Sequence, residues 1–147
     1  MFELYRITHT NDPRVISGNN NVVAVNNALA VDLSGQVASD SLGPRPYSGV
    51  GGQLDFVIGA MLSRGGRSIS VLPSTARGGT VSRIAPTLAQ GQGVSVPRGW
   101  VDYVVTEYGI ANLFGKSFKE RAEELISVAH PDFRSELRRK AQELSIL

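Results

Sequence analysis

The chain has 147 residues, of which 41% are hydrophobic and 19% are charged, and its formal net charge is +2. These values predict one soluble globular domain over residues 1–147 and argue against nucleic-acid binding. The absence of cysteine excludes disulfides, thiolate metal sites and a cysteine nucleophile. No apolar run is long enough to span a bilayer and no signal peptide opens the chain, which predicts a cytoplasmic protein.

The N-terminal part is predicted to contain short strands and one helical turn. Residues 2–7 alternate apolar and polar residues, as a strand does. Asp12 and Pro13 predict the cap and the first residue of a helical turn. Residues 22–33 are interpreted as two strands, and Ser34-Gly35 predicts a hairpin turn into a third.

The stretch 47–62 joins a glycine-rich loop to a predicted helix. Gly49, Gly51 and Gly52 precede a segment whose apolar residues keep helical spacing. Such a loop lets backbone N–H groups approach a ligand and directs the positive end of the helix dipole at it. A phosphate, a carboxylate or the oxyanion of an attacked thioester suits this arrangement. A simple tight turn gives the same glycine pattern, so this alternative stays open.

A buried strand is predicted at residues 68–72, and a polar loop at residues 74–80 follows its carboxyl end. In open α/β sheets, ligands bind beyond the carboxyl ends of the strands. Ser74, Thr75 and Arg77 are therefore candidates to hold phosphate or pantetheine groups. Hydrogen bonds within the loop's own turn are the alternative use of these side chains.

The rest of the chain is predicted to form further strands and two terminal helices. Strands are expected at residues 82–84, 94–96 and 101–106. Ser117 and Glu120 form a capping box that starts one helix, and Pro131 begins the last. The whole pattern is typical of an α/β protein.

Several strings of residues occur in a characteristic order. They are T-N-D-P at 10–13, S-G-V-G-G-Q-L-D-F at 48–56, L-P-S-T-A at 72–76 with S-R-I at 82–84, Y-V-V-T-E-Y-G at 103–109 and A-H-P-D-F-R at 129–134. Together they resemble the C-terminal part of the acetyl-CoA hydrolase/transferase family, which includes acetate-, butyrate- and 4-hydroxybutyrate-linked CoA-transferases. The resemblance covers essentially the whole chain. It implies a mixed sheet flanked by helices, in the C-terminal portion of a CoA-transferase-like fold.

The resemblance also implies a reaction. In this family a glutamate attacks the acyl-CoA thioester, and a glutamyl-CoA thioester then passes CoA to an incoming carboxylate, or to water in hydrolysis. Each step passes through an oxyanion that needs hydrogen-bond donors. CoA and acyl-CoA are cosubstrates, with no covalently bound cofactor. With His9 and His130 as the only histidines and no carboxylate cluster beside them, no metal site is predicted.

The glycine-rich loop supplies the candidate site residues. The backbone N–H groups of Gly51 and Gly52 are the predicted oxyanion donors. The residues expected to contact CoA are Gly49, Val50, Gln53, Ser74, Thr75 and Arg77. Small carboxylates and acyl-CoA are the expected substrates, with neither nucleic acid nor membrane as a partner.

One part of the family pattern is missing. The nucleophilic glutamate of the family lies in a motif upstream of the matched portion, and no counterpart is found here. Glu107 is a weak substitute, because the glycine-rich tail of a nucleophile motif does not follow it. The chain is therefore expected to need an N-terminal half, or a partner chain that carries it, and to be inactive alone.

A second interpretation stays open. The chain could be a non-catalytic module that binds CoA or a nucleotide, or that acts in assembly. Half of a two-domain enzyme should also expose apolar surface, which predicts a homo-oligomer.

Overall fold

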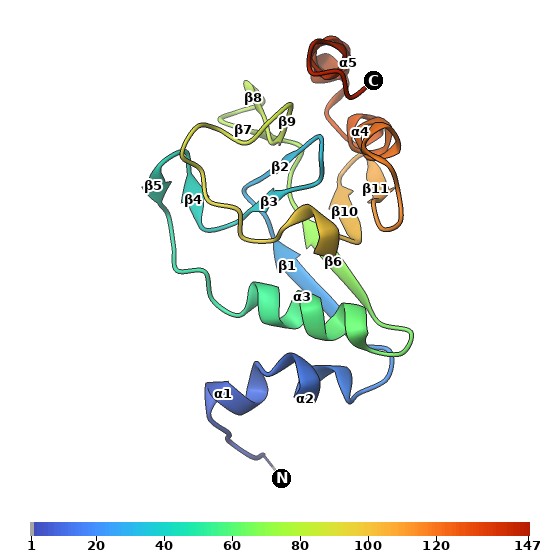
Figure 1. The fold of residues 1–147 in the computed structure, drawn as a ribbon. Helices are drawn as coiled ribbons and strands as arrows, with labels where there is room; N and C mark the ends of the chain where they lie inside the picture. The colour runs from blue at the N-terminus through green and yellow to red at the C-terminus, as the bar shows by residue number, and fades with distance from the viewer. Residues whose placement is uncertain (1) are drawn as a thin grey trace.

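The computed structural model describes residues 2–147 (Figure 1). The helices are α1 (Ile7–Thr10), α2 (Pro13–Ser17), α3 (Gln53–Leu62), α4 (Phe118–Ser127) and α5 (Pro131–Glu143), with a short 3-10 helix, η1, at Arg98–Trp100. The strands are β1 (Val23–Asn27), β2 (Ala30–Asp32), β3 (Val37–Ala38), β4 (Ser41–Leu42), β5 (Arg45–Pro46), β6 (Arg67–Val71), β7 (Thr75–Ala76), β8 (Val81–Ser82), β9 (Ile84–Ala85), β10 (Tyr103–Thr106) and β11 (Gly109–Asn112). The predicted α/β class is confirmed.

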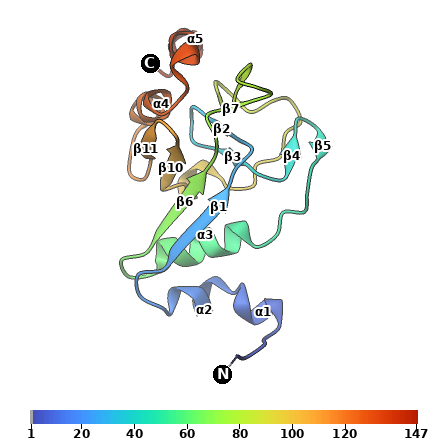
Figure 2. The ribbon, with the colours of Figure 1, turned by 180° about the vertical axis from the view of Figure 1, so that it is seen from behind.

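The central sheet has the strand order β1-β6-β10-β11. β1, β6 and β10 run parallel, and β11 returns antiparallel to β10, so the sheet is mixed, as expected. α3 packs against β1 and β6, and α2 packs on α3 (Figures 1 and 2). The two helices approach closely at Gly59, because a Cβ there would lie 2.5 Å from Cγ2 of Ile16.

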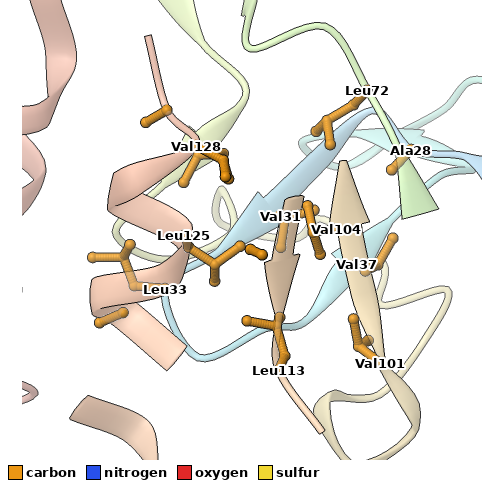
Figure 3. Close-up of a cluster of buried hydrophobic side chains, with 14 of the residues drawn as sticks. Ala28, Val31, Leu33, Val37, Leu72, Val101, Val104, Leu113, Leu125 and Val128 are labelled. Atoms are coloured by element: carbon orange, nitrogen blue, oxygen red, sulfur yellow. The ribbon is translucent and has the colours of Figure 1, made fainter. Parts of the chain in front are cut away.

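A second sheet, in the order β3-β2-β9, completes the core. β2 and β3 form the predicted hairpin across Ser34-Gly35, where Asp32 Oδ1 accepts a hydrogen bond from the Ser34 N–H at 3.0 Å. Figure 3 shows the hydrophobic cluster in which both sheets meet α4. Its fully buried members include Val31, Val104 and Leu125.

The two terminal helices follow their local signals. Ser117 and Glu120 form the predicted capping box, and α4 begins directly after it. α4 buries its apolar residues Ala122, Leu125 and Ile126. Pro131 begins α5, as predicted. Within residues 2–147, no helix has the length and apolar character needed to cross a membrane.

Two predicted strands are absent. Residues 2–6 lie outside any strand, and Ile7 begins α1. Alternation alone does not make a strand, and Phe2 and Leu4 stay fully exposed because no neighbouring strand or core covers them. The 94–96 stretch forms only one isolated bridge, between Val96 and Val37.

Candidate functional site

Two polar segments lie toward the carboxyl ends of the parallel strands. The first is the glycine loop, residues 48–52, which leads into α3. A short turn joins the end of α3 to the start of β6, so the N-terminus of α3 lies toward the end of the sheet where β6 finishes (Figure 1). The second segment is the β7–β8 hairpin, residues 74–82, which follows β6.

The glycine loop presents backbone at the N-terminus of α3. Gly52 is the N-cap residue, and no side chain caps the helix there. A Cβ at Gly52 would lie 2.2 Å from Asn11 Nδ2, so the absence of a side chain permits this close approach. Gly51 has a φ of +61°, a conformation that favours glycine. An uncapped helix N-terminus with bare backbone before it favours an anion.

Asn11 connects the glycine loop with the N-terminal helices. Its Nδ2 donates a hydrogen bond to Oδ2 of Asp55, in the first turn of α3, at 3.4 Å. A hollow of about 390 Å³ beside the loop is lined by Ile7, Thr8, Asn11, Asp12, Gly51 and Asp55. Gln53 is buried, and within residues 2–147 its Nε2 has no hydrogen-bond partner. The T-N-D-P and S-G-V-G-G-Q-L-D-F strings therefore meet in space.

Ser74 and Glu107 form a second close pair. Ser74 is fully buried. Its hydroxyl donates to Glu107 Oε1 at 2.6 Å, and its backbone N–H donates to Oε2 at 2.8 Å. Ser74 follows β6 and Glu107 follows β10, so the pair ties together the ends of two adjacent parallel strands.

The Ser74 hydroxyl holds the pKa of the Glu107 carboxyl below its ordinary value of 4.5, with help from backbone N–H groups. Tyr108 meets the His130 ring edge-on at a centroid distance of 5.3 Å. The guanidinium carbon of Arg134 lies 5.6 Å from the centre of the Tyr108 ring. Because its pKa is lowered, Glu107 is a carboxylate at neutral pH, and it is suited to accept hydrogen bonds and not to donate a proton.

The other candidate residues of the hairpin differ in their contacts. Arg77 is exposed and has a φ of +51°, and among residues 2–147 it makes no ion pair. The Thr80 hydroxyl donates to the Arg77 carbonyl oxygen at 2.9 Å, which is the turn chemistry that the sequence left open. The Thr75 carbonyl oxygen accepts from Arg83 Nε at 3.4 Å. Within the described chain, no hydrogen bond joins the hairpin to the glycine loop.

Sequence reasoning did not find two of these contacts. Asn11 belongs to the T-N-D-P string at residues 10–13, but no feature of the neighbouring sequence indicated that its side chain would lie against Gly52. Glu107 is named above only as a weak substitute for the nucleophile, and in the structure it accepts hydrogen bonds from the Ser74 hydroxyl and N–H. Gly51, Gly52 and the other predicted ligand contacts remain predictions.

Replacing Glu107 with glutamine should destabilise the chain at neutral pH and progressively less as the pH falls. The folded-state pKa of Glu107 lies below its ordinary value of 4.5. Its carboxylate therefore contributes stability above about pH 4.5, and this contribution is lost as the pH falls through the lowered pKa. Denaturant unfolding of the unchanged chain and of Glu107→Gln at a series of pH values measures the difference in their free energies of unfolding.

Glu123→Gln, on the exposed side of α4, controls for the loss of one negative charge. A Glu107→Gln difference that stays constant from neutral pH to well below 4.5 would contradict the ionised pair with Ser74.

A match to a known family model shows the family to which this chain belongs. The model of the "Acetyl-CoA hydrolase/transferase C-terminal domain" matches residues 1–141. This chain belongs to the acetyl-CoA hydrolase/transferase family. The chain is 53% identical over 137 residues to a 4-hydroxybutyrate coenzyme A transferase of Clostridium kluyveri, a match that covers 93% of this chain and 32% of that protein.

Two solved structures share the fold. RipA from Yersinia pestis is 48% identical, with a TM-score of 0.90 over 96% of this chain and 32% of RipA. A 4-hydroxybutyrate CoA-transferase from Porphyromonas gingivalis is 40% identical, with a TM-score of 0.75 over 95% of this chain and 31% of that one. The chain thus spans about a third of the length of each of these proteins.

Proposed function

We propose that this chain forms the C-terminal part of the active site of an enzyme that moves CoA between an acyl-CoA and a small carboxylate such as acetate. The observation that carries the proposal is the extent of the family match. Relatives named as CoA-transferases align with 93% and 95% of the chain, and an acetyl-CoA hydrolase of Saccharomyces cerevisiae aligns with 78%.

The proposed reaction has two exchanges at one glutamate, supplied by a region outside residues 2–147. The glutamate carboxylate attacks the thioester carbonyl, and the tetrahedral oxyanion collapses to an acyl-glutamyl anhydride and CoA thiolate. The thiolate attacks the glutamyl carbonyl, releasing the first carboxylate and leaving a glutamyl-CoA thioester. An incoming carboxylate repeats both steps in reverse and leaves with CoA. With water as the acceptor, the outcome is hydrolysis.

The contribution of this chain is electrostatic. Every tetrahedral step places negative charge on a former carbonyl oxygen, and donors fixed in advance stabilise it most. The N–H groups of Gly51 and Gly52 are the proposed donors, because Gly52 is the N-cap residue of α3 and no side chain caps the helix there. The open space at Gly51 leaves room for a substrate to approach the backbone. The Glu107 carboxylate, held by Ser74, would accept hydrogen bonds from substrate donors near the same sheet end.

CoA would be held by two groups of residues. The loop residues Gly49, Val50 and Gln53 lie near the reacting thioester in this proposal, while Thr75 and Arg77 of the hairpin lie nearer the pantetheine or phosphate groups. Ser74 would act through Glu107, because its own polar atoms are buried and occupied. Since no hydrogen bond joins the two groups within residues 2–147, we expect the region that carries the glutamate to complete the pocket.

Calorimetric titration with CoA tests this proposal. The titrated proteins are this chain and a chimera, in which the part of the Clostridium kluyveri enzyme that precedes its matching region is joined to residues 2–147. We expect saturable binding to the chimera and none to the chain alone. A folded chimera that fails to bind CoA would refute the proposed function. Equal binding by the chain alone would refute a pocket completed by the preceding region.

A further inference from the structure

The central sheet has one covered face and one open face. Side chains alternate across a sheet, and paired residues in adjacent strands share a face. Register therefore places Ala24, Ser68, Ser70, Val104 and Ala111 on one face, and all five are buried. α3 packs on this face at β1 and β6, and α4 packs on β11.

The opposite face carries apolar residues on all four strands. We call it the open face. Its apolar residues are Val23, Val25, Ile69, Val71, Tyr103, Val105 and Ile110, and Asn27, Arg67 and Asn112 lie on it as polar residues. Val23, Val25 and Ile110 are 50%, 61% and 66% exposed, and the other four apolar residues are half-buried. Parallel sheets normally have both faces covered, and contiguous exposed apolar patches mark docking surfaces.

The edge of the same sheet is also unprotected. β1 is the terminal strand and reads Val-Ala-Val-Asn-Asn, without the proline or lysine that natural edge strands use to prevent pairing. A hollow of about 500 Å³ adjoins the open face, and it is lined in part by Arg67, Tyr103 and Asn112. An apolar surface continuous with an unprotected edge suits the packing of further α/β structure.

We infer that the open face is the docking surface for the region that precedes this domain in longer members of the family. Family members contain this segment as about 32% of their length, and the matching model is a C-terminal domain, so most of their chain precedes it. The occupant is expected to present an apolar helix face to Val25 and Ile110. This inference rests on family membership and not on CoA chemistry.

Docking here has a consequence for the site. β6 and β10 carry the centre of the open face and end at the hairpin and at Glu107. A structure packed on this face therefore reaches the sheet end where Ser74 and Glu107 are paired. The same surface would both stabilise the assembly and position the glutamate that the proposed function assigns to the preceding region.

Thiol labelling tests the inference directly, because the chain has no cysteine. Val25→Cys and Ile110→Cys place a reactive group on the open face, and Leu144→Cys, 46% exposed at the end of α5, is the matched control. Labelling at each residue is followed by mass spectrometry in the isolated chain and in the chimera. We expect at least about tenfold slower labelling of the two open-face positions in the chimera, and an unchanged rate at the control.

A second measurement separates the possible occupants. Sedimentation of the isolated chain, with and without Val25→Glu, reports self-association. Equal labelling rates in the chain and the chimera would overturn the inference. A second pair of results would also overturn it: the isolated chain forms a dimer that Val25→Glu dissociates, and Val25→Cys and Ile110→Cys stay reactive in the chimera. A second copy of the chain would then be the occupant of the open face. Protection in a chimera that does not bind CoA would leave docking supported and refute only the proposed function.

Discussion

Replacing Arg121 with methionine should lower the free energy of unfolding by about 3 kcal/mol. Arg121 lies on α4 and is 8% exposed. Its guanidinium donates to three backbone carbonyl oxygens, those of Arg98 at 2.8 Å, Lys116 at 3.1 Å and Ser34 at 3.3 Å. Within the described residues it forms no salt bridge, so these carbonyls are its partners. Methionine has no donor, and all three acceptors would lose their hydrogen bonds.

Denaturant unfolding followed by circular dichroism measures this loss. Arg138→Met, on an exposed part of α5, should change stability by no more than about 0.5 kcal/mol. Arg121→Lys should recover only part of the lost free energy of unfolding, because an ammonium does not reproduce the planar arrangement of the guanidinium N–H donors. If Arg121→Met unfolds within about 1 kcal/mol of the unchanged chain, the three hydrogen bonds do not stabilise the fold as described.

Replacing Gly52 with valine should lower CoA transfer in the chimera by about 100-fold or more, the usual effect of losing an oxyanion donor. The new Cβ would fall 2.2 Å from Asn11 Nδ2. Either Asn11 leaves Asp55, or the loop backbone moves and the N–H groups at the start of α3 lose their position. Gly99→Ala is the matched control, because a Cβ at Gly99 meets nothing within 4 Å and Gly99 lies outside the candidate site.

A double variant separates the two explanations for Gly52. Asn11→Ala removes the side chain that the new Cβ would strike. If Gly52 serves only to accommodate Asn11, combining Asn11→Ala with Gly52→Val should be no slower than Asn11→Ala alone. If Gly52 must also let substrate approach the backbone, the double variant should stay slow, and this is the expected result. Near-normal transfer by Gly52→Val alone would remove the loop from the mechanism.

The sequence predicted elements whose causes are local. The capping box at Ser117 and Glu120 acts within one helical turn, and the α4 helix begins where it indicates. The hairpin at Ser34-Gly35 depends on a turn that its own residues determine. The strand predicted at residues 2–7 was wrong because a strand needs a partner, which alternation does not reveal.

The candidate site was predictable only in part. The glycine loop carries its own signal, since several glycines precede a helix. The pairing of Ser74 with Glu107, and of Asn11 with Gly52, joins residues that are far apart in the chain. Such contacts follow from the parallel arrangement of β6 and β10 and from the packing of α2 on α3. Neither arrangement is encoded in a single stretch, so spacing alone could not find them.

An assay of CoA transfer from acetyl-CoA to 4-hydroxybutyrate, by the chimera and by this chain alone, tests most directly whether this domain forms part of the active site. We expect transfer by the chimera, loss of that transfer in Gly52→Val, and no transfer by the isolated chain. Transfer by the isolated chain would contradict the requirement for a glutamate from the preceding region. No transfer, to this or to other small carboxylates or water, by a folded chimera that binds CoA would contradict the assignment of this domain to the active site.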